Sequence, residues 1–202
     1  MTTQSPYSPQ PITLLEAVNV LLETIGVAPV ASLLTGETNA DVETALRSIH
    51  TTSMAVQSQG WDFNTEEGIT LDPNPTTGEV ALPANCLKVD PSGLDVGEWI
   101  IARGRKLYDK FNHTLAIGRP VVVDMVVGLD FEDLPQSART YIAVRAARAF
   151  AEGRVTVLNG FTQEQEDEAL VAMLHEEDQS DDRTLFQKNP RFRRRARHRR
   201  RT

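Results

Sequence analysis

The chain changes its pattern of apolar residues abruptly at Gly60, and this change constrains the fold more than any other feature. From Thr38 to Gln59 the apolar residues recur at helical spacing, whereas Trp61–Pro73 reads like a strand followed by a turn. The junction contains two large aromatic residues, Trp61 and Phe63. No catalytic motif requires this arrangement. The sequence therefore predicts a chain in which a helical part passes directly into a β-rich part.

Four segments carry the start signals and apolar spacing of α-helices. The first begins at Thr13, which with Glu16 three residues later fits a reciprocal capping box. The same signal recurs at Thr38 and Thr162, and the third helix follows Leu134-Pro135, because proline suits a first helical turn. The expected apolar faces are Leu15, Val18, Leu22 and Ile25 in the first helix, Ala138, Ile142, Ala146, Ala149 and Phe150 in the third, and Ala169, Leu170, Met173 and Leu174 in the fourth.

The region between the second and third helices is expected to form short, mostly antiparallel strands. Arg103-Gly104, between two strand-like runs, predicts a hairpin. Trp99 is expected in the core of this region. The strand-like pieces, separated by clusters of proline, glycine and asparagine, are Gly68–Leu71, Glu79–Leu82, Leu87–Val89, Glu98–Ala102, Lys106–Tyr108 and Val121–Val127.

This order of elements predicts an α+β fold: an antiparallel four-helix bundle with a small, mostly antiparallel β-domain inserted into it. Two helices are too few to enclose a core, so the first pair is expected to pack on the second pair. The expected divisions are a flexible N-terminal arm (1–12), the first bundle part (13–66), the β-rich insertion (67–133), the second bundle part (134–180) and an arginine-rich tail (181–202).

Charge is distributed very unevenly along the chain. The first 190 residues hold 13 basic and 28 acidic groups, a balance of -15, and no acidic residue follows Asp182. The C-terminal segment cannot bury a core and is expected to be disordered when alone. Its guanidinium groups suit phosphate or carboxylate oxygens, so DNA and an acidic protein surface are both reasonable targets, beside a solvated extension without a partner. The arginines of this segment are Arg191, Arg193, Arg194, Arg195, Arg197, Arg199, Arg200 and Arg201.

Signals for enzymes, cofactors and membranes are weak. Cys86 is the only cysteine, which excludes an intrachain disulfide and a zinc site built on clustered cysteines. Phosphate-binding loops, nucleophile elbows and His-Glu-x-x-His are missing from the sequence. The acidic run Glu164–Glu168 fits a solvated helix face better than a metal site. We therefore expect no cofactor, no metal, no membrane span and no secretion signal in residues 1–11.

Several stretches, taken together, resemble tail tubular protein A of short-tailed bacteriophages (podoviruses). They are Ala17–Pro73, Ala102–Asp109, Asp130–Pro135 with Arg139 and Tyr141 after it, and Gln165–Ala169. The resemblance implies a non-enzymatic virion protein of the phage tail, assembled in the host bacterial cytoplasm. It implies a ring of twelve subunits that joins the portal protein to the tail nozzle, tail tubular protein B, with the tail fibre as a further neighbour. DNA would pass through the lumen during ejection without sequence-specific contacts.

Two sets of residues are candidate interfaces. The eight arginines of the tail are candidates for contact with the portal or with DNA. Trp61 and Phe63 either seal the domain junction or anchor a partner, and sealing is favoured. Two other functions stay open: a nucleic-acid-binding protein that acts through its tail, and a glycan-hydrolysing tail enzyme that uses Asp130, Glu132 and Asp133.

Overall fold

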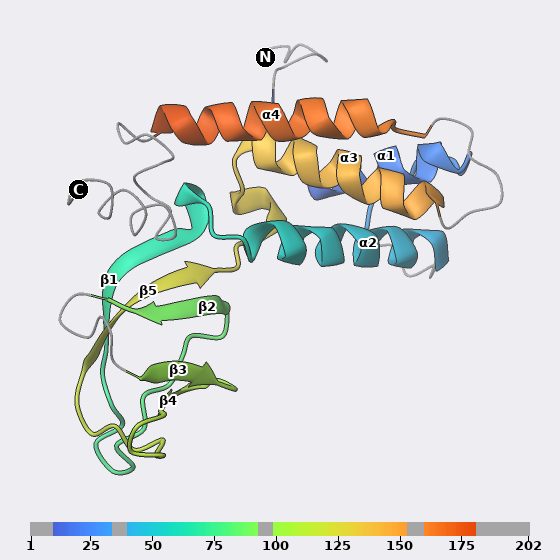
Figure 1. Cartoon of the computed structure of the whole chain (residues 1–202). Helices are drawn as coiled ribbons and strands as arrows, with labels where there is room; N and C mark the ends of the chain where they lie inside the picture. Colours follow the sequence, from blue (N-terminus) through green and yellow to red (C-terminus); the bar gives the residue numbers. More distant parts are fainter. Residues whose placement is uncertain (1–9, 34–39, 93–98, 153–159, 181–202) are drawn as a thin grey trace, which may run out of the picture. The chain divides into compact units, whose positions relative to one another are not determined.

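The computed structural model describes residues 10–33, 40–92, 99–152 and 160–180. The chain divides into two compact units (Figure 1). The helical unit combines residues 1–52 and 134–202, and the β unit comprises residues 53–133. The helices are α1 (Leu14–Thr24), α2 (Ala40–Gln57), α3 (Gln136–Glu152) and α4 (Gln163–Ser180). The β unit contains the last turn of α2, strands β1 to β5, and the short 3-10 helices η1 (Asp62–Asn64) and η3 (Phe131–Asp133).

Helix α3 is the centre of the helical unit. It packs against α1 and α4, and Ser48 Oγ of α2 donates to its Ala146 carbonyl at 3.2 Å. More than half of its side chains are buried, too many for the single stripe of a surface helix. Five of the nine buried residues are alanines, which let neighbouring helices approach closely. Ala149 was expected in the buried face of this helix, but the structure shows that it is exposed.

The expected helix starts agree with the structure wherever it describes them. Thr13 Oγ1 accepts from the Glu16 amide at 3.2 Å, and Glu16 Oε2 accepts from the Thr13 amide at 2.7 Å. Thr162 and Gln165 form the same reciprocal pair at the start of α4. The cap expected at Thr38 lies outside the described residues. In α1 the fully buried side chains are Ala17, Val18, Leu21 and Leu22, so the apolar face is rotated from the expected one.

The expectation of an antiparallel four-helix bundle is wrong. The chain is α+β with four helices and two small antiparallel sheets, and the helices are interspersed with strands instead of closing around one core. Helix α4 buries only Glu166 and Met173 fully among its side chains up to Glu177, because its first turns are highly charged. It can cover α3 but cannot line a core shared by four helices. Helix α2 leaves the helical unit at Ser53, where its last turn joins the β unit.

The main sheet of the β unit has three antiparallel strands in the order β1-β5-β2 (Figure 1). These strands are β1 (Thr65–Leu71), β2 (Cys86–Pro91) and the central β5 (Val121–Val127). The register of β1 on β5 shifts between Glu66 and Ile69, where Gly68 has a positive φ and donates to Asp124 Oδ1 at 2.8 Å. Strand β5 is largely buried because it has a neighbour on both edges and a core beneath it.

A second sheet is the hairpin β3 (Ile100–Arg103) and β4 (Lys106–Asp109), as Arg103-Gly104 predicted. Gly104 has a φ of 63° and Arg103 pairs with Lys106 across a two-residue turn. The core that the β unit shares between its sheets contains Val80, Leu82, Val89, Ile100, Leu107, Val121, Val123, Met125 and Val127. The expected strand Glu79–Leu82 forms only isolated bridges, although Val80 is fully buried.

Within its described residues, the chain has no helix whose length and apolar character would let it cross a membrane.

Candidate interaction surfaces

The turn between α2 and β1 requires glycine at position 60. Gly60 has a φ of 79° and its amide donates to the Gln57 carbonyl at 3.1 Å, which closes the last turn of α2. A Cβ atom at this position would lie 2.9 Å from a Val126 methyl. Both the backbone angle and the space therefore exclude larger residues. The helix ends at Gln57 with a turn up to Gly60, as the change of periodicity predicted.

Trp61 and Phe63 stack on each other directly after this turn. Their ring centroids are 6.4 Å apart and their planes are 4° from parallel. Trp61 is buried, and its Nε1 donates to the Val56 carbonyl of α2 at 2.8 Å. Phe63 is half-buried. Trp61 thus fastens the last turn of α2 to η1 inside the β unit, while a role of either ring in contact with a partner stays a prediction.

Two buried amides, which the sequence analysis missed, complete the joint. Gln57 Nε2 donates to Ser53 Oγ and to the Leu129 carbonyl, and its Oε1 accepts from the Leu129 amide at 2.7 Å. Asn64 Nδ2 donates to the Gln57 and Val127 carbonyls at 3.0 and 2.9 Å, and its Oδ1 accepts from the Trp61 amide at 2.9 Å. Each amide therefore provides hydrogen-bond partners for backbone groups inside the joint.

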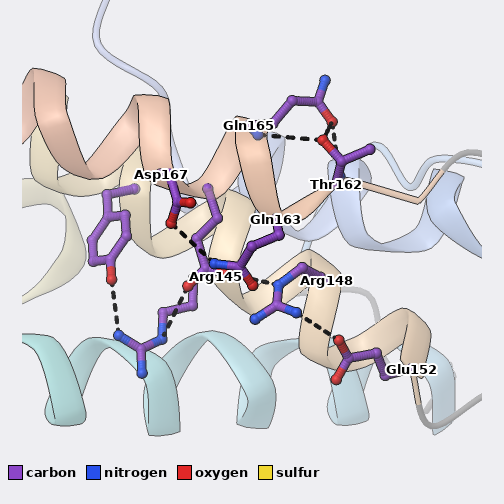
Figure 2. A network of polar contacts seen from close by, with 9 residues as sticks. Arg145, Arg148, Glu152, Thr162, Gln163, Gln165 and Asp167 are labelled. Carbon is purple, nitrogen blue, oxygen red and sulfur yellow. Dashed lines mark hydrogen bonds and ion pairs between the residues drawn. The ribbon is translucent and has the colours of Figure 1, made fainter.

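A polar network joins α3 to α4 in the helical unit (Figure 2). Its centre is Glu166, a carboxylate of α4 with only 7% of its surface exposed. Glu166 accepts from Arg148 Nε at 2.5 Å and lies 3.8 Å from Arg145 Nε. Arg148 also reaches Glu152 at 2.8 Å. The hydrogen bond to Glu166 is the largest of the contacts that raise the pKa of Arg148 above its usual value. Glu166 therefore links α4 to two guanidinium groups of α3.

The opposite side of α4 is acidic and exposed. We call Glu164, Asp167, Glu168 and Val171 the α4 outer face; with Gln163 they line a shallow hollow. Val171 is 50% exposed. Glu164, Glu168 and Val171 follow each other at i, i+4 and i+7, so they form one stripe along the helix.

The β3–β4 hairpin and the residues that flank its strands expose large apolar side chains as well as cations. Trp99 is 62% and Phe111 75% exposed, and Ile101 is also exposed. The expectation that Trp99 lies in the core is therefore wrong. Successive residues of a strand point to opposite sides, so the burial of Ile100 turns Trp99 and Ile101 outward. We call the hairpin face the exposed side chains Trp99, Ile101, Arg103, Arg105, Lys110 and Phe111.

Cations cover the aromatic rings of this hairpin. The Arg103 guanidinium lies 3.4 Å from the centroid of the Tyr108 ring, and Lys110 Nζ lies 5.7 Å from that of Trp99. The Lys110 amide donates to the Trp99 carbonyl at 2.7 Å, which extends the pairing beyond β4. These cation–π contacts hold the positive charges beside apolar surface.

Of the other predicted site residues, the structure describes the acidic ones and Cys86. The arginines from Arg191 to Arg201 lie outside the described residues. Asp130, Glu132 and Asp133 are exposed around the single turn η3. Within the described ranges, no group of three or more His, Cys, Asp or Glu side chains could hold a metal ion. Cys86 is half-buried, and burial raises the pKa of its thiol.

Exposed apolar side chains among charges, on a chain of two small units, are typical of a protein that assembles with other chains. The comparison with known families agrees with this class. The family model described as "Tube: Tail tubular protein" matches residues 15–183. The chain belongs to the tail tubular protein family, as its sequence resemblance indicated.

One similar protein is Tail tubular protein A of Klebsiella phage KP34, which is 31% identical over 130 residues. The alignment covers 64% of this chain and 66% of the relative, just under two thirds of the relative's length. Family membership makes the chain a structural protein of a phage tail and a component of the virion.

Proposed function

We propose that this chain forms a ring that joins the portal to the tail nozzle of a short-tailed phage, with twelve subunits around a lumen that DNA crosses. The observation that carries this proposal is the family match over residues 15–183, which includes the described helices and strands except Leu14, the first residue of α1. Assembly in the host cytoplasm and contacts with the nozzle protein and tail fibres belong to the same proposal. The role is structural, without catalysis or a bound cofactor.

The described surfaces support an assembly role in both units. The helical unit presents the acidic α4 outer face, and the β unit presents the hairpin face. A ring subunit must contact two copies of itself as well as the proteins above and below it. Obligate interfaces of this kind bury over about 2,000 Å². Two chemically different exposed surfaces on one chain suit such repeated contacts.

Sedimentation of the purified chain with and without portal protein, followed by electron microscopy of the product, tests the proposal. We expect rings on the portal, whether or not the chain associates alone. A chain that sediments as a monomer with both portal and nozzle proteins would refute the adaptor role.

The arginine-rich tail is proposed to dock on an acidic surface of the portal or of a neighbouring subunit. Removing residues 191–202 should then reduce the number of rings assembled per portal. If the truncated chain caps the portal as often as the full chain, the tail is not the docking element.

The eight arginines also favour a second candidate function, binding of nucleic acid. In that case the full chain should bind DNA without portal protein, and removing residues 191–202 should abolish the binding. In a plot of the logarithm of the binding constant against the logarithm of the salt concentration, each neutralised phosphate should make the slope more negative by about 0.9. Portal binding without such DNA binding favours the adaptor.

A glycan-hydrolysing role would need Asp130, Glu132 or Asp133 as the catalytic pair. A sugar-release assay on cell-wall or capsule material tests this alternative directly. Release by the native chain that is lost in Glu132→Gln would contradict the structural proposal, and we expect no release from either.

A further inference from the structure

We propose that the hairpin face of one copy docks on the α4 outer face of the next copy. This inference rests on the proposed ring, and it names the surfaces by which neighbouring subunits would meet. The two surfaces belong to different parts of the chain, so the contact is heterologous: each copy uses one surface to the left and the other to the right. Heterologous contacts close into rings when the rotation between copies allows it.

The hairpin face has the composition of an interface centre. Trp99 and Phe111 are among the most exposed large apolar side chains of the described chain. Aromatic residues dominate the binding energy of protein contacts when they become buried. Arg103, Arg105 and Lys110 of the same hairpin are exposed as well, and Lys110 Nζ lies beside the Trp99 ring. A partner for this face must therefore offer an apolar centre among negative charges.

The α4 outer face offers that chemistry. Val171 lies in a shallow hollow that Glu164, Asp167 and Glu168 also line. These three carboxylates match the three cations of the hairpin face in number and opposite sign. The buried carboxylate of Glu166 is already paired with Arg148 and Arg145 of α3. The α4 outer face can therefore bind another chain without breaking these pairs between α3 and α4.

Complementary charge also suits assembly at a virion. Opposite potentials steer two copies into one register and exclude the pairing of two hairpin faces or two α4 faces, which would bring like charges together. Contacts of this kind weaken as salt rises, because exposed charges are screened over about 8–10 Å.

Charge reversal on each face tests the contact in the full chain. The α4 variant carries Glu164→Lys and Glu168→Lys, and the hairpin variant carries Arg105→Glu and Lys110→Glu. A control with Glu23→Lys and Glu43→Lys, at exposed positions of α1 and α2, makes the same change of net charge as the α4 variant. Association is measured by sedimentation over a range of concentrations, alone and with portal protein, and circular dichroism verifies that each variant is folded.

We expect each face variant to weaken self-association more than about a hundredfold, since like charges at an interface cost several kcal/mol. The control should stay within about threefold of the native chain. Mixing the two face variants should restore association, because the α4 variant retains a native hairpin face and the hairpin variant retains a native α4 face. If folded face variants associate as the native chain does, or if their mixture stays dissociated, the proposed contact is wrong.

Cysteine cross-linking locates the contact directly. In a Cys86→Ser background, Phe111→Cys and Val171→Cys chains are mixed, assembled and oxidised. We expect a disulfide-linked dimer, and none when Glu176→Cys replaces Val171→Cys. Assembled material without the cross-link would place the contact elsewhere and overturn this inference while leaving the ring intact. A native chain that stays monomeric even with portal and nozzle proteins would instead refute the ring itself.

Discussion

Asn64 is the side chain on which the joint between α2 and the main sheet most depends. Its amide is buried and makes three hydrogen bonds, two to the Gln57 and Val127 carbonyls and one from the Trp61 amide. Asn64→Ala removes all three at once. The Val127 carbonyl and the Trp61 amide then lose this buried partner, and the Gln57 carbonyl keeps the Gly60 amide alone of the two donors.

The expected cost follows from these contacts. A typical hydrogen bond contributes about 1 kcal/mol net, and a buried group left without a partner costs about 1–3 kcal/mol. The substitution should therefore destabilise the β unit by about 3–5 kcal/mol, a large part of the 5–15 kcal/mol typical of a folded domain.

Urea unfolding measures this loss. For a slope of about 1–1.5 kcal/mol per M, the midpoint should fall by about 2–5 M. Tryptophan fluorescence reports on the β unit, because Trp61 and Trp99 both belong to it, and circular dichroism reports on both units. The control is Asn74→Ala, because Asn74 also bonds backbone amides, at 2.9 and 3.1 Å, but at an exposed turn. We expect that control to cost at most about 1 kcal/mol.

Equal losses for the two asparagines would refute the reasoning. That result would mean that burial does not increase the contribution of the Asn64 hydrogen bonds to the free energy of unfolding. A loss below about 1 kcal/mol for Asn64→Ala would also refute the reasoning, provided that the unfolding free energy depends on urea concentration with the same slope in the variant and the native chain.

Three further predictions concern a turn, a helix pair and a cap. Gly60→Ala should lower the unfolding free energy of the β unit, measured by urea unfolding, by more than about 2 kcal/mol, because the new methyl would lie 2.9 Å from a β5 side chain. The control Gly104→Ala should cost only about 1 kcal/mol, because Gly104 has a positive φ but nothing within 4 Å of the added methyl. Glu166→Gln removes the negative charge that pairs with two guanidinium groups of α3. Hydrogen exchange of the backbone amides of α4 should then become at least about tenfold faster. Unchanged exchange rates would show that the polar network does not hold α4 on α3. The hydrogen bonds from the Thr13 amide and hydroxyl lower the pKa of Glu16 below its usual value, so the stability they confer is present above the usual pKa and is lost as pH falls through the lowered pKa. Thr13→Ala removes the hydroxyl and keeps the amide, so an NMR titration should show the pKa of Glu16 rising only part of the way to its usual value.

Local sequence signals predicted the local structure well. The capping boxes at Thr13 and Thr162 and the turn at Gly60 are present, and so is the Arg103-Gly104 hairpin. Each of these features depends on contacts within a few residues or on the backbone freedom of one glycine. The sequence alone is therefore sufficient to specify them.

The candidate site was less accessible from sequence. The exposure of Trp99 depends on which side of β3 faces the core, and a run of three apolar residues does not reveal that. The burial of Gln57 had one signal in the sequence, because Gln57 lies eight residues after Ile49 and so on the apolar side of α2. The burial of Asn64 had no such signal. The pairing of Glu166 with arginines of α3 joins residues 18 and 21 positions apart.

Signals within a few residues predicted the helix caps, the turn at Gly60 and the hairpin, although the expected strand Glu79–Leu82 forms only isolated bridges, and the resemblance to tail tubular proteins indicated the family. The packing of the elements could be read from the three-dimensional structure alone: α3 lies among the helices, α4 covers it with one narrow face, and α2 ends inside the β unit. The reason is physical. Element boundaries follow from short-range hydrogen bonds and backbone angles, whereas packing depends on which of several similar apolar faces find partners far away in the chain.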